Sequence, residues 1–177
     1  DIKPGNVMVT RGGSVKVMDF GIARALADVG ATMTSAQAVV GTARYLSPEQ
    51  AQGQSVDART DLYSAGCVLF ELLTGRAPFV GEPVSLVYQH IGEQPQPPSL
   101  YESSVSPALD AVVLHSLAKG RDDRYQSAAD FRADVVAARS GQPISAAAQA
   151  STDCDVFMAV GTSLTVHPAA GLVELAA

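Results

Sequence analysis

Residues 62–73 read LYSAGCVLFELL and carry apolar side chains on nearly every helical face. A helix that is apolar on all sides lies buried inside a domain. Gly75 and Pro78 follow, and both residue types end helices. The stretch therefore predicts a buried central helix around which the rest of the domain packs.

The segments on either side predict shorter elements. Residues 7–10 and 15–19 are β-rich runs that flank RGGS, which predicts a hairpin. Residues 21–46 show no clear period, and loops of that length are usually functional. Further helices are expected over 83–91, from the N-cap Ser106 to Gly120, and from Ser127 through Ala138. The fold class is therefore mainly α with a small β-hairpin.

Composition excludes several classes of protein. The 177 residues are 47% hydrophobic and 17% charged, enough for one domain and a short remainder. A net charge of −6 argues against nucleic acid or anionic membranes as partners. The two cysteines, Cys67 and Cys154, lie far apart without ligand spacing, so neither a disulfide scaffold nor a zinc site is expected. No apolar run reaches the length of a membrane span.

Two short motifs near the start carry the chemistry of phosphoryl transfer. Asp1, Lys3 and Asn6 of DIKPGN supply a carboxylate, a cation and an amide oxygen. DFG at residues 19–21 follows a strand, where a carboxylate beside glycine suits magnesium. Each motif alone is equally acceptable as a turn.

Further motifs follow in a fixed order: GTARYLSPE at 41–49, DARTDLYSAGCVLFELLTGRAPF at 57–79 and RDDRY at 121–125. Together with D-x-K-x-x-N and DFG they resemble the C-terminal lobe of eukaryotic-type serine/threonine protein kinases, over residues 1–140. The wording of VKVMDFGIAR and GRAPF is similar to that of bacterial, particularly actinobacterial, members. The resemblance implies a kinase-like C-lobe that uses ATP and Mg²⁺ and acts on protein serine and threonine.

The resemblance also implies roles in phosphoryl transfer. Asp1 would be the catalytic base, and Lys3 would contact the γ-phosphate. Thr42 would hydrogen-bond toward both, while Asn6 and Asp19 would hold magnesium ions. A further residue, Met8, would lie beneath the adenine ring, where a flexible thioether is suitable.

Other matching residues would support the site. Phe20 and Gly21 belong to DFG, and Phe20 would pack in the regulatory spine. Glu49 and Arg124 would form a buried ion pair that ties the activation segment to the helical body. Asp61 would anchor the backbone of the catalytic loop; as an alternative it is a capping or solvated aspartate.

Residues 21–46 would then be the activation segment, with hydroxyls at Thr32, Thr34 and Ser35. Thr34 is the expected autophosphorylation site, and its phosphate would order the loop by pairing with an arginine such as Arg24. Alternatively, these three hydroxyls are ordinary loop residues.

The tail differs from the rest of the chain. After a polar stretch predicted to be a linker, 141–152, residues 153–177 resemble the NAD-binding segment of sirtuin deacylases, a strand-turn-helix of Rossmann-like fold. Gly161, Thr162 and Ser163 match the triplet that contacts NAD there. Two cysteines cannot build the four-cysteine zinc ribbon of that family, so deacylase activity is excluded.

We therefore expect a serine/threonine protein kinase, cytoplasmic, whose longer parent could be membrane-anchored. The sequence lacks a Gly-rich phosphate loop, a strand lysine and its glutamate partner. The chain is expected to be truncated before Asp1 and inactive alone. The alternatives are a non-catalytic kinase-like scaffold and a fusion with a sirtuin. The sequence predicts no oligomeric state.

Overall fold

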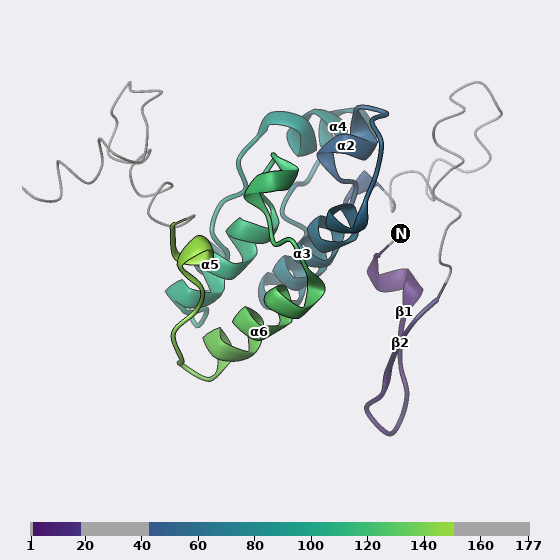
Figure 1. The fold of residues 1–177 in the computed structure, drawn as a ribbon. Helices are drawn as coiled ribbons and strands as arrows, with labels where there is room; N and C mark the ends of the chain where they lie inside the picture. The colour runs from purple at the N-terminus through teal and green to yellow at the C-terminus, as the bar shows by residue number, and fades with distance from the viewer. Residues whose placement is uncertain (1, 19–42, 151–177) are drawn as a thin grey trace, which may run out of the picture.

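The computed structural model describes residues 2–18 and 43–150, which form a helical body and a small hairpin (Figure 1). The elements in order are η1 Pro4–Asn6, β1 Val7–Val9, β2 Val15–Val17, α2 Pro48–Ala51, α3 Ala58–Thr74, α4 Pro83–Gly92, η3 Pro98–Leu100, α5 Pro107–Ser116, η4 Arg121–Asp123 and α6 Ala128–Arg139. The predicted class, a mainly helical fold with one small antiparallel sheet, is confirmed.

Helix α3 is the predicted central helix, and its ends follow from local chemistry. The Asp57 side chain accepts a hydrogen bond from the Arg59 amide at 2.8 Å and caps the first turn. Gly75 adopts a left-handed conformation, φ 73°, and ends the helix. The prediction that α3 is buried on all faces is wrong, because its neighbours leave Leu72 78% exposed.

The core lies where α3 packs against α5. Tyr63, Cys67 and Phe70 of α3 are fully buried with Val113 and Leu117. The helices approach closely at Gly66, since a Cβ there would lie 2.2 Å from the Ser116 Oγ. A glycine in mid-helix is therefore explained by packing rather than by a turn.

Helix α5 ends earlier than predicted. Ser106 caps its start as expected, accepting from the Leu109 amide at 3.3 Å. The helix stops at Ser116 instead of continuing to Gly120, which lies in an extended conformation before η4. The carbonyls of Ala118 and Lys119 accept hydrogen bonds from the Arg124 side chain, so the backbone has left the helix to meet them.

The stretch expected to be a linker is partly structured. Residues 146–150 are helical, and Ile144 and Ala148 pack into the cluster that contains Phe131. Asp134 of α6 accepts from the Ser145 amide at 2.9 Å. Up to residue 150 the chain therefore belongs to the body, and the linker prediction is wrong there. The tail from 153 lies outside the described residues, so the division of the chain beyond 150 stays a prediction.

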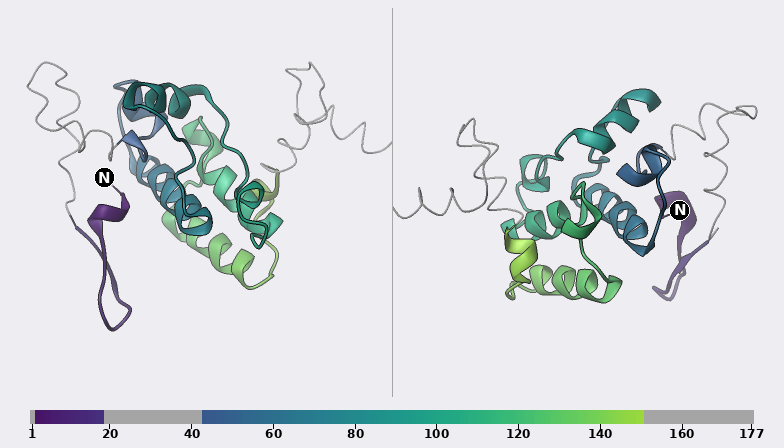
Figure 2. Two further views of the ribbon diagram at one scale, coloured as in Figure 1. Left: turned by 180° about the vertical axis from the view of Figure 1, so that it is seen from behind. Right: turned by 45° about the horizontal axis from the view of Figure 1, so that its top comes forward.

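The hairpin is the element closest to the predicted catalytic loop. Strands β1 and β2 pair antiparallel, with Val7 opposite Val17 and Met8 opposite Lys16. Figure 2 shows the hairpin from two further sides, with η1 beside the α2–α3 part of the body and the strands extending away from it. None of the described helices is long and apolar enough to cross a membrane.

Candidate active site

Residues 2–6 of DIKPGN form a tight turn that buries its asparagine. Lys3 is extended and precedes the 3₁₀ turn, and the Asn6 amide donates to the Lys3 carbonyl at 2.9 Å. Asn6 is 8% exposed, whereas Lys3 is half-buried. The turn that was the alternative interpretation of this motif is thus present, and the roles of Lys3 and Asn6 in phosphoryl transfer stay predictions.

The hairpin brings the residue before the second predicted magnesium ligand next to the first ligand, Asn6. The Met18 amide donates to the Asn6 carbonyl at 2.7 Å, directly beyond the Val7–Val17 pair. Residue 18, the neighbour of Asp19, therefore lies against Asn6. An amide and a carboxylate oxygen are ligands that Mg²⁺ accepts, so the residue types fit that ion. Asp19 itself lies outside the described residues.

Much of the predicted site falls outside residues 2–18 and 43–150. The positions concerned are the kinase-like Asp1, Asp19, Phe20, Gly21, Thr32, Thr34, Ser35 and Thr42, and the tail residues Gly161, Thr162 and Ser163. Their roles stay predictions.

Two further predicted residues can be placed. Met8 lies on β1 with half of its surface exposed, so its thioether is open to contact. Asp61 lies exposed in the first turn of α3, where a carboxylate suits the helix dipole. Their proposed contacts, with adenine and with the catalytic loop, stay predictions.

The predicted ion pair between Glu49 and Arg124 is present and buried. The two guanidinium NH groups donate to the two carboxylate oxygens, each at 2.9 Å. The side chains are 2% and 0% exposed. This bidentate geometry joins α2, which follows the predicted activation segment, to the segment between α5 and α6.

The pair is embedded in further hydrogen bonds. Thr60 of α3 donates its hydroxyl to Glu49 at 2.7 Å. Arg124 also donates to the carbonyls of Ala118 and Lys119, at 2.6 and 3.0 Å. Burial alone would raise the pKa of Glu49, but the bonds from Arg124 and Thr60 outweigh it and lower that pKa. Glu49 is therefore held as a carboxylate.

Sequence reasoning missed a second link between the segment before α2 and the body. The Tyr45 hydroxyl donates to Glu71 of α3, and Ser64 donates to the Tyr45 carbonyl at 2.8 Å. Burial, with help from Glu71, raises the pKa of Tyr45 well above its usual range. One signal existed: Ser64 and Glu71 are polar residues in an otherwise apolar run.

Sequence reasoning also missed a cluster of buried and half-buried polar side chains, Tyr63, His90 and Lys119, at the C-terminal end of α4. The Tyr63 hydroxyl lies 2.9 Å from the His90 Nδ1, and the Lys119 ammonium donates to the carbonyls of Gln89 and His90 at 3.2 and 3.0 Å. Burial lowers the pKa of His90 to about 4 and that of Lys119 to about 8. Lys119 thus binds the last carbonyls of α4.

Comparison with known proteins gives a consistent picture. The family model described as "Protein kinase domain" matches residues 1–135. The chain is 60% identical over 149 residues to a probable serine/threonine-protein kinase of Streptomyces coelicolor, covering 84% of this chain and 22% of that protein. It is 59% identical over 143 residues to serine/threonine-protein kinase PknB of Mycolicibacterium smegmatis, covering 80% and 23%.

A third relative, a probable serine/threonine-protein kinase PknB of Bifidobacterium longum, is 53% identical over 155 residues, covering 86% of this chain and 22% of that protein. The chain thus spans about a fifth of the length of these relatives. The family match ends at residue 135 and none of the three is named a sirtuin, so NAD binding by the tail stays a prediction.

Proposed function

The chain belongs to the protein kinase family, and from this premise we propose that it forms the catalytic lobe of a serine/threonine kinase. The reaction would transfer the γ-phosphate of ATP to serine or threonine hydroxyls of proteins. The observation that carries the proposal is the hairpin, in which the Met18 amide donates to the Asn6 carbonyl at 2.7 Å. Met18 precedes Asp19 in the sequence.

The proposed roles follow from what the transfer needs. Asp1 accepts the proton of the attacking hydroxyl, and Lys3 stabilises charge on the transferring phosphoryl group. Thr42 hydrogen-bonds toward both. Asn6 and Asp19 hold Mg²⁺, which neutralises charge on the phosphates when bound. Met8 forms the floor beneath the adenine ring.

The segment between DFG and α2 would carry regulation. Phosphate on Thr34 would order this segment by pairing with Arg24. Its C-terminal end is held by the Glu49–Arg124 pair and by the Tyr45–Glu71 bond. Once ordered by phosphate, the activation segment would therefore continue into a C-terminal end that the body already holds in place.

We further propose that the chain alone transfers phosphate very slowly. Its sequence contains no G-x-G-x-x-G run, the feature that covers the phosphates in protein kinases. A second candidate function is a kinase-like scaffold that binds proteins without turnover.

A chimera tests the proposal. Residues 1–140 of this chain replace the matching stretch of the M. smegmatis PknB, and transfer of labelled phosphate from ATP to a protein substrate is measured. We expect the chimera to be active and Asp1→Asn to lower its rate by about 10²–10⁴-fold, the usual contribution of a general base. Asp122→Asn is the matched control, because that carboxylate is 96% exposed on η4.

The outcomes separate the two candidates. A folded chimera without turnover would favour the scaffold, and equal rates for Asp1→Asn and Asp122→Asn would remove Asp1 from the reaction. The isolated chain, assayed in parallel, is expected to give no transfer above background. Transfer by the isolated chain that Asp1→Asn abolishes would overturn the claim of slow turnover.

A further inference from the structure

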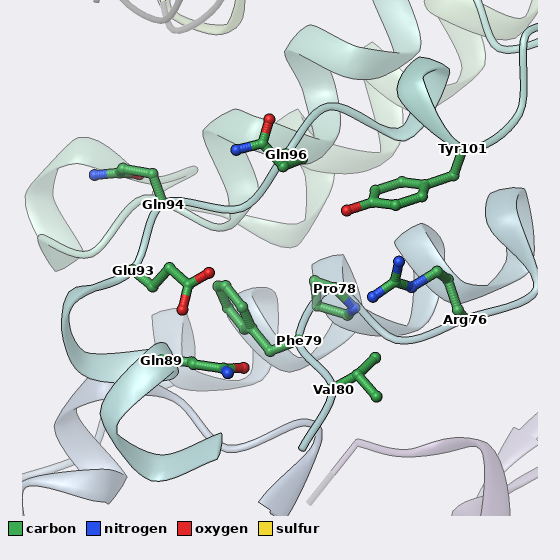
Figure 3. A pocket seen from close by; sticks show the side chains of 9 residues that line it. All are labelled: Arg76, Pro78, Phe79, Val80, Gln89, Glu93, Gln94, Gln96 and Tyr101. Carbon is green, nitrogen blue, oxygen red and sulfur yellow. The ribbon is translucent and has the colours of Figure 1, made fainter. Parts of the chain in front are cut away.

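A small polar pocket lies away from the turn and hairpin of the candidate active site. It is formed by the loop that follows α3 and the segment that follows α4, and its volume is about 120 Å³. Figure 3 shows Arg76 and Tyr101 at one end, Gln96 above and Glu93 beside Phe79. None of the described residues assigned to phosphoryl transfer lines it.

Arg76 is held in place at this pocket. Its amide donates to the Thr74 Oγ1 at 3.3 Å, and that hydroxyl lies 3.0 Å from the Arg76 carbonyl. The guanidinium carbon lies 4.3 Å from the centre of the Tyr101 ring, and Phe70 contacts that ring edge-on. A stacked guanidinium keeps its forked donors available and loses little freedom when a ligand binds.

The pocket lining carries one guanidinium, Arg76, and one carboxylate, Glu93. No carboxylate within residues 2–18 and 43–150 forms an ion pair with Arg76. Glu93 is the acidic residue of the pocket lining, and it lies close enough to Lys119 to act on that ammonium. Burial lowers the pKa of Lys119 to about 8, and Glu93 opposes this shift. The guanidinium of Arg76 is therefore the basic group of the lining, and it has no ion-pair partner among the described residues.

Size decides what kind of ligand fits. Pockets that enclose whole small molecules have volumes of roughly 300–1,000 Å³. A pocket of about 120 Å³ accommodates one polar group rather than a whole metabolite. A single side chain presented by a larger polypeptide fits this size.

We propose that the pocket binds one acidic side chain of a docked protein, through the guanidinium of Arg76, which lies against the Tyr101 ring. The group is a carboxylate or a phosphate, both of which a guanidinium fork recognises. The inference rests on the proposed function, for which it names a substrate class: proteins with an acidic residue outside the phosphorylated position.

Binding to the full chain, measured without ATP, tests this. Three peptides share one Gly/Ser-rich sequence and differ only at the centre, which is glutamate, phosphoserine or glutamine. Titrations followed by nuclear magnetic resonance give the dissociation constants. We expect the glutamate or phosphoserine peptide to bind at least about tenfold tighter than the glutamine peptide, and binding to weaken with salt.

Variants link the binding to the pocket. Arg76→Gln should weaken binding by about tenfold, and Tyr101→Leu should also weaken it because the stack is lost. Arg132→Gln, at an exposed position on α6, should change nothing. Thermal unfolding checks that each variant is folded. If Arg76→Gln does not fold, the binding constants of Tyr101→Leu test the proposal instead.

Each outcome decides the question. Binding of the glutamate peptide alone identifies a carboxylate ligand, and binding of the phosphoserine peptide alone identifies a phosphate. Equal affinity for all three peptides, or no change in Arg76→Gln, would overturn the proposal. Because no step depends on phosphate transfer, a failure of the proposed function would appear in the chimera assay and not here.

Discussion

The same ion-pair chemistry occurs in two settings in this chain. Glu49 and Arg124 pair with almost no exposed surface, whereas Arg59 pairs with Asp122, whose side chain is 96% exposed. Removing one partner of a buried pair strands a charge in a medium that cannot solvate it. An exposed partner is simply replaced by water. Burial, rather than the number of contacts, should decide the energetic importance of each pair.

We therefore predict that Glu49→Gln lowers the free energy of unfolding by about 3 kcal/mol or more, whereas Asp122→Asn changes it by less than about 1 kcal/mol. The double variant Glu49→Gln/Arg124→Met should lose less than the sum of the single variants, since neither charge is then left alone. Urea unfolding measures the free energy of unfolding of the two single variants, Glu49→Gln and Arg124→Met, of the double variant and of Asp122→Asn. Additive losses would contradict the proposed coupling.

His90 predicts a pH dependence. Its pKa is about 4 in the folded chain, and the ordinary value is 6.5. Between these values the unfolded chain binds the proton and the folded chain does not, so stability falls as pH decreases through this range. The loss from this group between pH 7.5 and pH 5 is about 2 kcal/mol.

The test is the difference in unfolding free energy between these two pH values. In His90→Gln the contribution should be absent. In His115→Gln, which removes another buried histidine with a lowered pKa, the His90 contribution should remain. An unchanged pH dependence in His90→Gln would contradict the prediction.

At the scale of elements, the features that were predictable from sequence have local causes. The start and end of α3 follow from Asp57 and Gly75, and the hairpin follows from β-rich runs around a glycine turn. Two features have non-local causes. Leu72 is exposed because no neighbouring element covers it, and α5 ends early where the Arg124 side chain donates to the Ala118 carbonyl. Such causes appear only when the chain is folded.

The candidate site divides in the same way. Glu49 and Arg124 could be paired from the sequence only because the motif order of the kinase family links the two positions across the chain. Tyr45 and Glu71 belong to no such pattern in the sequence analysis, and their bond spans 26 positions. The available signal was the presence of polar residues inside an apolar helix. Such a signal does not indicate which residue is the hydrogen-bond partner.

The α3–α5 contact yields a prediction about glycine. Gly66→Ala places a methyl group against Ser116, and overpacking of this kind costs about 1–3 kcal/mol. Gly92→Ala, at the end of α4 with open space around it, should be neutral or stabilise by up to about 1 kcal/mol. Thermal unfolding compares the two; a stable Gly66→Ala variant would mean that α3 and α5 can separate at little cost.

At the scale of the whole molecule, residues 144–150 extend the body beyond α6. Asp134 accepts hydrogen bonds from the Ser145 amide and the Tyr125 hydroxyl, each at 2.9 Å, and so joins this segment to the core. Ala148 is fully buried, and Ala146 is exposed. If the segment were a free linker, substitutions at these two positions would have equal effects.

Ala148→Asp should release the segment, because a buried, unpaired carboxylate is unfavourable. Its cost cannot exceed the free energy of docking the segment, since undocking returns the carboxylate to water. Limited proteolysis should therefore cut within 141–150 much faster in Ala148→Asp than in Ala146→Asp. Equal cleavage rates would restore the linker interpretation.

The burial of Cys67 gives a way to time the motions of the core. A thiol reacts as its thiolate, and burial raises the pKa of Cys67 far above its usual range. Reagents can reach it only when the cluster around it opens, in which Tyr45, Val113 and Leu117 pack against α3. In a Cys154→Ser background, the rate of thiol labelling under native conditions, measured by mass spectrometry, would give the rate of that opening.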